Sequence, residues 1–363
     1  MIEKEHQEDS ALRVNEGIDQ PSPMNPEAAR RFRESIPRET DAGGYVRGIL
    51  DGNRALLSKA ITMVESSLPR HQQLAQEIIA GCVPHSGKSI RVGITGVPGV
   101  GKSTFIEALG KYLTTRGNRI AVLAIDPSSR RTKGSILGDK TRMEDLANDP
   151  NAYIRPSSSA GTLGGVARNT RESIILCEAA GFNIIFVETV GVGQSETAVH
   201  SMVDFFLLLM LAGAGDELQG IKRGIMEMAD AIVINKADGD NVKKAQLAAR
   251  EYKNALHLFP PSPSGWTPLV LTASATEGSG VSNTWDMVEN YTGLTRGSGY
   301  FEQRRKEQAL QAFTDTIEET IRQKFYHDPA VVSHLQIVQN EILSGKISPY
   351  AAAQELIKAY FKQ

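Results

Sequence analysis

The sequence predicts an α/β protein with a mostly parallel sheet flanked by helices. Short apolar runs alternate with helical segments through the middle of the chain, a glycine-rich turn follows the first of these runs, and helical patterns occupy both flanks. Such alternation is typical of a parallel sheet with helices on both faces, where ligands bind at the carboxyl ends of the strands. The expected strands cover residues 90–95, 120–125, 184–188, 205–211, 231–235 and 269–272.

The composition is that of a globular protein without a strong charge bias. Of 363 residues, 40% are hydrophobic and 23% are charged, and 40 Lys and Arg against 42 Asp and Glu give a formal net charge of −2. This balance argues against a general nucleic-acid or anionic-membrane binder. Cys82 and Cys177, the only cysteines, lie outside any CxxC motif, which favours buried free thiols and a reducing compartment.

No targeting pattern is expected from the sequence. The N-terminal segment MIEKEHQEDS is acidic, unlike a secretory signal or an arginine-rich transit peptide. The longest apolar run, 205–215, is too short to span a bilayer. We therefore expect a cytoplasmic protein that does not associate with membranes.

Four regions are expected along the chain. In the N-terminal half, a polar segment with four prolines precedes two helices that break at Leu68–Pro69, because a residue before proline is pushed out of the helical region. Near the C-terminus we expect helices over 301–326 and 329–343 and a last helix capped by Ser348. The regions are a flexible arm (1–43), a helical extension (44–86), a nucleotide-binding domain (87–296) and a C-terminal helical region (297–363).

A phosphate-binding signature follows the first expected strand. The segment GVPGVGKS matches GxxxxGK[ST] and opens an expected helix, which indicates the P-loop NTPase class. Backbone N–H groups of such a loop converge on phosphate, Lys102 reaches the β- and γ-phosphates, and the Ser103 hydroxyl ligates Mg²⁺. The residues expected at the nucleotide are Gly96, Gly99, Val100, Gly101, Lys102, Ser103 and Thr104.

A second motif indicates that the base is guanine. Asn235 opens the tetrapeptide NKAD after an apolar run. A carboxylate at Asp238 can accept both the ring N–H and the exocyclic amine of guanine, a donor pair that adenine lacks, while the stem of Lys236 covers the base. At the end of the next expected strand, the backbone amides near Ser274 and Ala275 can contact the guanine oxygen. The sequence therefore predicts GTP and GDP as the nucleotides.

The segment ETVG, from Glu188 to Gly191, stands where GTPases commonly carry DxxG. The glycine amide would sense the γ-phosphate, and the acid would hold Mg²⁺ or its water. Val192 occupies the position of the water-orienting Gln of Ras-like proteins, so we expect slow unassisted hydrolysis. Gln194 is a nearby substitute, for which a structural role is the favoured alternative.

Two further acids follow the second expected strand, Asp126 directly and Asp139 later in a loop. Near a triphosphate, such carboxylates can complete Mg²⁺ coordination or position water. Helix capping is the alternative for each. The neighbouring Arg130, Arg131 and Lys133 either meet phosphate or stay solvated.

Several longer segments carry a resemblance to a known family. They are DPSS (126–129), GSILGDKTRM (134–143), GTLGGVARNTRE (161–172), ETVGVGQSE (188–196) and GDELQGIKRGIMEMADAIVINKAD (215–238). These strings resemble the MeaB/ArgK-type GTPases, the methylmalonyl-CoA mutase-associated chaperones related to the human protein defective in one form of methylmalonic aciduria. The resemblance covers about residues 45–345 and implies a helical extension, a GTPase domain and a C-terminal arm for homodimerisation.

The resemblance also implies roles for single residues. In this family the GTPase docks on the adenosylcobalamin-dependent mutase and uses GTP hydrolysis to gate cofactor delivery and to protect or rescue the mutase. By the matching motifs, Lys102 and Ser103 carry phosphate and metal roles. Asp126, Asp139 and Glu188 carry Mg²⁺ and hydrolysis roles.

The segment around Gln219 and Lys222 resembles the third switch of the family, which relays the nucleotide state to the mutase. Lys222 could also neutralise transition-state charge, as an arginine finger does, with a surface lysine as the alternative. The implied partners are the mutase, its adenosyltransferase and a second copy of the chain, and the implied cofactors are GTP/GDP and Mg²⁺.

Two segments depart from the family pattern. Many relatives carry a glycine pair before SILGD, where this chain has Arg130 to Lys133 and a single Gly134. A Pro/Ser-rich insert, 260–265, precedes Trp266, for which we favour a core role over contact with the base.

Three other functions stay open. A kinase would pass the γ-phosphate to an arginine/ornithine transport binding protein, although no acceptor pocket is evident in the sequence. Metal insertion usually requires His-rich tracts or paired Cys-His ligands, whereas the seven histidines here are scattered. A scaffold that binds GTP without turnover is the third.

Overall fold

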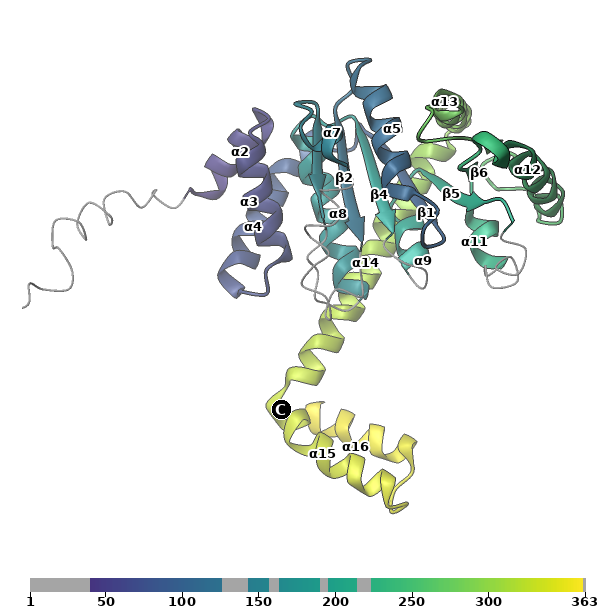
Figure 1. The fold of residues 1–363 in the computed structure, drawn as a ribbon. Coiled ribbons are helices and arrows are strands. Elements are labelled where there is room, and N and C mark those ends of the chain that lie inside the picture. Colours follow the sequence, from purple (N-terminus) through teal and green to yellow (C-terminus); the bar gives the residue numbers. More distant parts are fainter. Residues whose placement is uncertain (1–39, 126–142, 157–162, 190–194, 214–222, 362–363) are drawn as a thin grey trace, which may run out of the picture. The chain divides into compact units, whose positions relative to one another are not determined.

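A parallel sheet organises the chain, as expected. The computed structural model describes residues 40–125, 143–156, 163–189, 195–213 and 223–361. Within these ranges, seven parallel strands pair in the order β3-β2-β4-β1-β5-β6-β7 (Figure 1). The strands are β1 (Ile90–Gly96), β2 (Ile120–Ile125), β3 (Ala152–Arg155), β4 (Ile184–Thr189), β5 (Phe205–Leu211), β6 (Ala231–Asn235) and β7 (Leu269–Thr272).

All six expected strands are confirmed, and β3 was missed. This edge strand has only four residues, AYIR, and pairs with β2 alone. A run so short carries too little periodicity to be recognised in the sequence.

Helices cover both faces of the sheet because alternate residues of each strand point to opposite sides. On β5, Phe205, Leu207 and Leu209 pack into one apolar layer, while Leu208 and Met210 pack into another. The first layer contains α5 (Lys102–Thr114), α7 (Glu144–Ala147) and α13 (Val281–Gly297). The opposite face carries α8 (Leu163–Ala179), α9 (Ser195–His200), α11 (Arg223–Met228) and α12 (Val242–Leu256).

Three helices precede the sheet where two were expected. They are α2 (Ala42–Leu50), α3 (Arg54–Glu65) and α4 (Pro69–Cys82), followed by the 3₁₀ turn η1 (Val83–His85). The break at Leu68–Pro69 is confirmed. The break between α2 and α3 was not expected. It arises because Gly52 adopts a φ of 76° and because the Asn53 side chain caps α3 by accepting from the N–H groups of Ala55 and Leu56.

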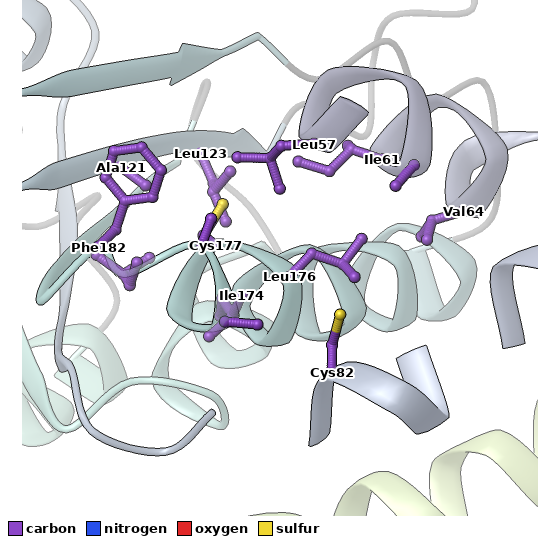
Figure 2. Close-up of a cluster of buried hydrophobic side chains, with 14 of the residues drawn as sticks. Leu57, Ile61, Val64, Cys82, Ala121, Leu123, Ile174, Leu176, Cys177 and Phe182 are labelled. Atoms are coloured by element: carbon purple, nitrogen blue, oxygen red, sulfur yellow. The ribbon is translucent and has the colours of Figure 1, made fainter. Parts of the chain in front are cut away.

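The N-terminal helices share a core with α8 and β2. Figure 2 shows Leu57 of α3 and Leu176 of α8 pointing into the same apolar cluster, with Leu123 of β2. Cys82 and Cys177 are free and buried in this cluster, as expected from their spacing. Burial raises the pKa of Cys82 to about 11 and raises the pKa of Cys177 further, so both thiols stay protonated near neutral pH.

The long helix α14 (Tyr300–His327) is attached to the amino-terminal edge of the sheet. Arg305 donates to both carboxylate oxygens of Asp204, at 2.8 and 2.7 Å, and to the carbonyl oxygens of Gly87 and Ser89. Farther along α14, Arg171 of α8 forms an ion pair with Asp315 at 3.1 Å. Polar contacts therefore attach α14 to the sheet domain at Arg305 and at Asp315.

Two more helices follow α14, close to their expected bounds. They are α15 (Pro329–Leu343) and α16 (Pro349–Phe361), and their mutual core includes Val331, Val338, Ala352 and Leu356. Ser348 caps α16 through the N–H of Ala351, as expected. All of these helices and strands belong to one compact unit, Ala42–Gln363. In the part of the chain that the structure describes, no helix is long and apolar enough to cross a bilayer.

Candidate nucleotide site

The glycine-rich loop joins β1 to α5 at the carboxyl edge of the sheet. Gly96 has a φ of 154°, and a Cβ at this position would lie 2.3 Å from the carbonyl oxygen of Leu209 on β5. Gly101 has a φ of 92° immediately before α5. Both positions require glycine because a side chain would be strained or would collide. The loop therefore lies directly at the helix N-terminus, where its N–H groups can bind an anion.

Lys102 lies back over this loop. Its Nζ donates to the carbonyl oxygen of Gly96 at 2.9 Å. Burial lowers the pKa of Lys102, while the carboxylates of Glu188 and Glu196 oppose this shift. A partly desolvated ammonium next to phosphate-binding N–H groups is suited to neutralise phosphate charge.

An oxygen pair for a metal ion lies beside the loop. The Ser103 hydroxyl donates to Oε1 of Glu188 at 3.2 Å, and both side chains are buried. Ser103 lies in the first turn of α5, and Glu188 lies near the end of β4, the neighbour of β1, so the fold brings together two residues that are 85 positions apart. Hydroxyl and carboxylate oxygens are hard ligands, and this donor set fits Mg²⁺ with phosphate oxygens completing the shell.

Asn235 connects the guanine motif to the phosphate loop. Its Nδ2 donates to the carbonyl oxygen of Val100 at 2.8 Å, and its Oδ1 is buried without a hydrogen-bond partner in the described part of the chain. The next residue, Lys236, has a φ of 58° and is the one non-glycine residue there with a positive φ. Strain at a site of this kind is stored where surrounding contacts fix the backbone.

Asp238 is held by hydroxyl groups from the β7 end of the sheet. Its Oδ2 accepts from Ser274 Oγ at 2.5 Å and from Thr276 Oγ1 at 3.3 Å. The N–H of Ala237 donates to the carbonyl oxygen of Ala273, which joins the two segments through the backbone. This arrangement orients the carboxylate for the guanine donors.

The geometry revises one detail of the expected base contact. The N–H of Ser274 donates to the carbonyl oxygen of Ser279 at 2.9 Å, so this residue acts through its hydroxyl on Asp238. Of the two amides expected at the guanine oxygen, the amide of Ala275 is the remaining candidate.

The sequence reasoning missed two side chains of this site. Thr276 orients Asp238, and Glu196, in the first turn of α9, lies fully buried with its charge close enough to raise the pKa of Lys102. The hydroxyl residues that follow the end of β7 could have indicated the role of Thr276 from the sequence. No local pattern marks Glu196, because its place depends on the packing of α9.

Several expected residues lie outside the described ranges. They are Asp126, Asp139, Gly191 and Lys222, together with Arg130, Arg131, Lys133, Val192, Gln194 and Gln219. Trp266 is partly buried and packs against the apolar core, and its Nε1 donates to the carbonyl oxygen of Asp230 at 2.9 Å, at the amino end of β6, which agrees with the favoured core role. No cluster of three His, Cys, Asp or Glu that could hold a metal occurs among the described side chains.

The fold and this site define a class of protein. A parallel sheet carries a phosphate loop after its central strand and an NKxD motif at the end of β6, with the two motifs joined by a hydrogen bond. This is the arrangement of a P-loop GTPase, in which GTP is bound and hydrolysed.

Comparison with known proteins identifies the family. The family model "Methylmalonyl Co-A mutase-associated GTPase MeaB" matches residues 57–330. The chain belongs to the MeaB family of GTPases. It is 51% identical over 315 residues to a "Probable GTPase" of Mycobacterium tuberculosis, which covers 87% of this chain and 94% of the relative.

Other relatives carry more specific names. The "Methylmalonic aciduria type A homolog, mitochondrial" of Mus musculus is 46% identical over 86% of this chain and 78% of its own length, and "GTPase ArgK" of Escherichia coli is 44% identical over 86% and 94%. A solved structure described as "LAO/AO transport system kinase" superposes with a TM-score of 0.72 at 36% identity, over 91% of this chain and 100% of that one. The expected resemblance to MeaB/ArgK-type GTPases is confirmed.

Proposed function

We propose that this GTPase is a Mg²⁺-dependent chaperone of adenosylcobalamin-dependent methylmalonyl-CoA mutase. It would gate delivery of the cofactor and protect or reactivate the mutase. The observation that carries the proposal is the family match over residues 57–330, a range that includes both nucleotide motifs. The description of this family names the mutase. The name of the mouse relative supports the same client.

The residues divide the work at the nucleotide. Lys102 would neutralise charge on the β- and γ-phosphates, and Ser103 and Glu188 would hold Mg²⁺, which supplies further charge neutralisation when bound. Asp126 and Asp139 would complete the metal shell or position water. The amide of Gly191 would sense the γ-phosphate, and Lys222 would stabilise transition-state charge.

We expect GTP hydrolysis to depend on the partner because of the residue at the position that normally orients the attacking water. Val192 has no group that can orient a nucleophilic water, and Glu188 stands where Asp is usual. Hydrolysis by the isolated protein should therefore be slow. Contact of the mutase with the segment around Gln219 would bring the missing groups into place.

The test is phosphate release from GTP with Mg²⁺, measured with and without purified mutase. We expect slow turnover alone and clearly faster turnover with the mutase. Lys102→Ala should abolish both rates, whereas Lys111→Ala, an exposed lysine on the same helix, should leave them unchanged. Turnover that ignores the mutase would leave the GTP site intact and exclude this client.

A homodimer is the second part of the proposal. Along α14, four exposed apolar side chains recur at helical spacing on one face, namely Leu310, Phe313, Ile317 and Ile321. An exposed apolar stripe of this kind marks an interaction surface. A second copy of the chain is the proposed occupant, in the cytoplasm, with the mutase and its adenosyltransferase as the other partners.

A kinase is the competing function, and the name of the solved relative favours it. "LAO/AO transport system kinase" implies transfer of the γ-phosphate to a protein acceptor. The two functions differ in the fate of the phosphate. With γ-labelled GTP and a purified arginine/ornithine-binding protein, the chaperone function predicts free phosphate and an unlabelled acceptor, whereas label on the acceptor would support the kinase.

A further inference from the structure

A second cavity lies at the edge of the sheet opposite the nucleotide. Its volume is about 490 Å³, and its lining residues include His200 and Asp230, which come just before β5 and β6. The nucleotide motifs, in contrast, follow the carboxyl ends of the strands. The other lining residues come from the end of α11, the loop after α12 and the first turns of α14. The cavity therefore has no part in the nucleotide site.

One wall of the cavity is apolar. It contains Met226, Phe259 and prolines of the Pro/Ser-rich insert, including Pro260, Pro261 and Pro263. The insert is held in shape by the Ser262–Ser264 hydroxyl pair at 2.7 Å and by the N–H of Gly265, which donates to the carbonyl oxygen of Ser262. This wall suits an aliphatic or aromatic group.

A guanidinium, that of Arg304, also lines the cavity. Nη2 of Arg304 donates to Nε2 of His200 at 3.1 Å and to its carbonyl oxygen at 3.5 Å, and Tyr300 is a further hydrogen-bond partner. These contacts use at most three of the five guanidinium N–H groups. Burial, followed by the charge of Arg304, lowers the pKa of His200 to about 4, so its ring is neutral and adds no second cation.

A carboxylate lines the same cavity without touching the guanidinium. Asp230 is buried, and its Oδ2 accepts from the N–H of Phe206 at 2.8 Å. Arg304 and Asp230 each perturb the other's ionisation, yet no ion pair joins them among the described residues. The other lining acids, Glu227 and Glu307, are exposed to water. Two opposite charges thus face one hollow from separate positions.

Gln308 also lines the cavity. Its Nε2 donates to the carbonyl oxygen of Val203 at 2.7 Å, while its Oε1 is buried and has no partner in the described part of the chain.

We propose that this cavity binds an α-amino acid with an apolar side chain. The ligand carboxylate pairs with Arg304, its ammonium group pairs with Asp230, and its side chain packs on the wall of Met226 and Phe259. A zwitterion matches both charges, which a simple anion or a simple cation does not. The binding is independent of GTP, so it can fail without affecting the proposed function.

Titration calorimetry on the full chain tests the ligand class at pH 7.5, above the pKa of about 6 that burial gives Asp230. The probes are L-phenylalanine, 3-phenylpropionate, which lacks the ammonium group, and phenethylamine, which lacks the carboxylate. We expect phenylalanine to bind at least roughly tenfold more tightly than either analogue, because each analogue leaves one charge unpaired. Equal binding of the three probes, or no binding of phenylalanine, would overturn the proposal.

Variants assign the two charges. Arg304→Gln should weaken phenylalanine and 3-phenylpropionate roughly tenfold and leave phenethylamine unaffected, and Asp230→Asn should weaken phenylalanine and phenethylamine only. Lys306→Gln, which removes an exposed cation of α14 outside the cavity, should change nothing. If a charge variant does not fold, Gln311→Trp, at an exposed lining position, should block binding by filling the space. Binding that survives Gln311→Trp and both charge variants would exclude this site.

Discussion

Asn235 and Asp238 contribute differently to nucleotide recognition, although they belong to one tetrapeptide. Asn235 is nearly fully buried and its side-chain amide donates to the carbonyl oxygen of Val100, so it holds the phosphate loop in place. Asp238 is oriented by two hydroxyl groups and keeps an oxygen for the base. One residue therefore sets the position of the loop, and the other sets the choice of base.

Asp238→Asn should exchange guanine for xanthine. The side-chain amide of the variant offers an N–H donor where guanine also presents N–H donors, whereas xanthine carries an oxygen acceptor in place of the exocyclic amine. We expect GTP affinity to fall roughly a hundredfold and XTP affinity to rise, because an unmatched buried hydrogen bond to a charged group is costly. Competition binding with both nucleotides measures this. Asp240→Asn, an exposed neighbour, should keep the preference for GTP, and an unchanged preference in Asp238→Asn would refute the assignment.

Asp230 gives a pH-dependent stability effect at the opposite edge of the sheet. Burial raises its pKa from 3.8 to about 6, with Arg304 opposing the shift, so the folded state binds more protons than the unfolded state between these values. The folded state thus loses stability as pH rises through this window.

Asp230→Asn should therefore gain stability relative to the wild type at higher pH. We expect the difference in unfolding free energy to change by about 1 kcal/mol between pH 5 and pH 7.5, in favour of the variant at pH 7.5. Urea unfolding at both values measures it, with Asp240→Asn as the exposed control. A difference that does not vary with pH would contradict the assigned pKa.

At the scale of elements, α9 and α11 lie in the connections that run from the carboxyl end of one strand to the amino end of the next. Each begins after a segment that carries expected nucleotide-sensing residues, 190–194 or 214–222, and the end of each lines the second cavity. The helix α14 closes that cavity and is itself attached through Arg305 to Asp204. The anchoring of α14 therefore supports both the cavity wall and the C-terminal helices.

Arg305→Met should destabilise the protein by about 3–5 kcal/mol, because it leaves the buried Asp204 carboxylate without its cation. Urea unfolding provides the measurement. The double variant Arg305→Met with Asp204→Asn should recover part of the loss, since no uncompensated charge remains. Lys306→Met, at the next and exposed position, should have little effect. A loss below about 1 kcal/mol would mean that the ion pair does not anchor α14.

At the scale of the whole molecule, the C-terminal helices present apolar surface that the described part of the chain does not cover. Phe313 is 64% exposed and Ile321 is 59% exposed on α14, and Leu343 and Tyr350 are exposed beyond it. A monomer rarely leaves side chains of this kind aligned in water. The proposed homodimer would bury the α14 stripe.

Phe313→Glu combined with Ile321→Glu should convert the proposed dimer to a monomer without loss of helix content. Each charge would be placed in an apolar interface, where an unpaired carboxylate is strongly disfavoured. Light scattering after size-exclusion chromatography gives the mass, and circular dichroism checks the fold. Gln323→Glu, off the stripe on the same helix, should remain dimeric. A wild-type chain that is monomeric at all concentrations would exclude this surface as a dimer interface.

The nucleotide chemistry was determined by local sequence. The phosphate loop needs closely spaced glycines, a lysine and a serine between a strand and a helix, and NKAD needs four consecutive residues, so short-range pattern reveals both. Buried parallel strands are also visible because they are continuous apolar runs. The same holds for the C-terminal helices, whose proline and serine boundaries are local signals.

Tertiary structure alone decided the contacts between distant segments. The Ser103–Glu188 pair, the Asn235 bond to Val100 and the burial of Glu196 depend on which strands are neighbours, and strand order is set by packing across the whole sheet. The second cavity has the same origin, because Arg304 and Asp230 are 74 residues apart and meet only where α14 crosses the edge of the sheet. Local pattern specifies which groups are present, and long-range packing specifies which of them share a site.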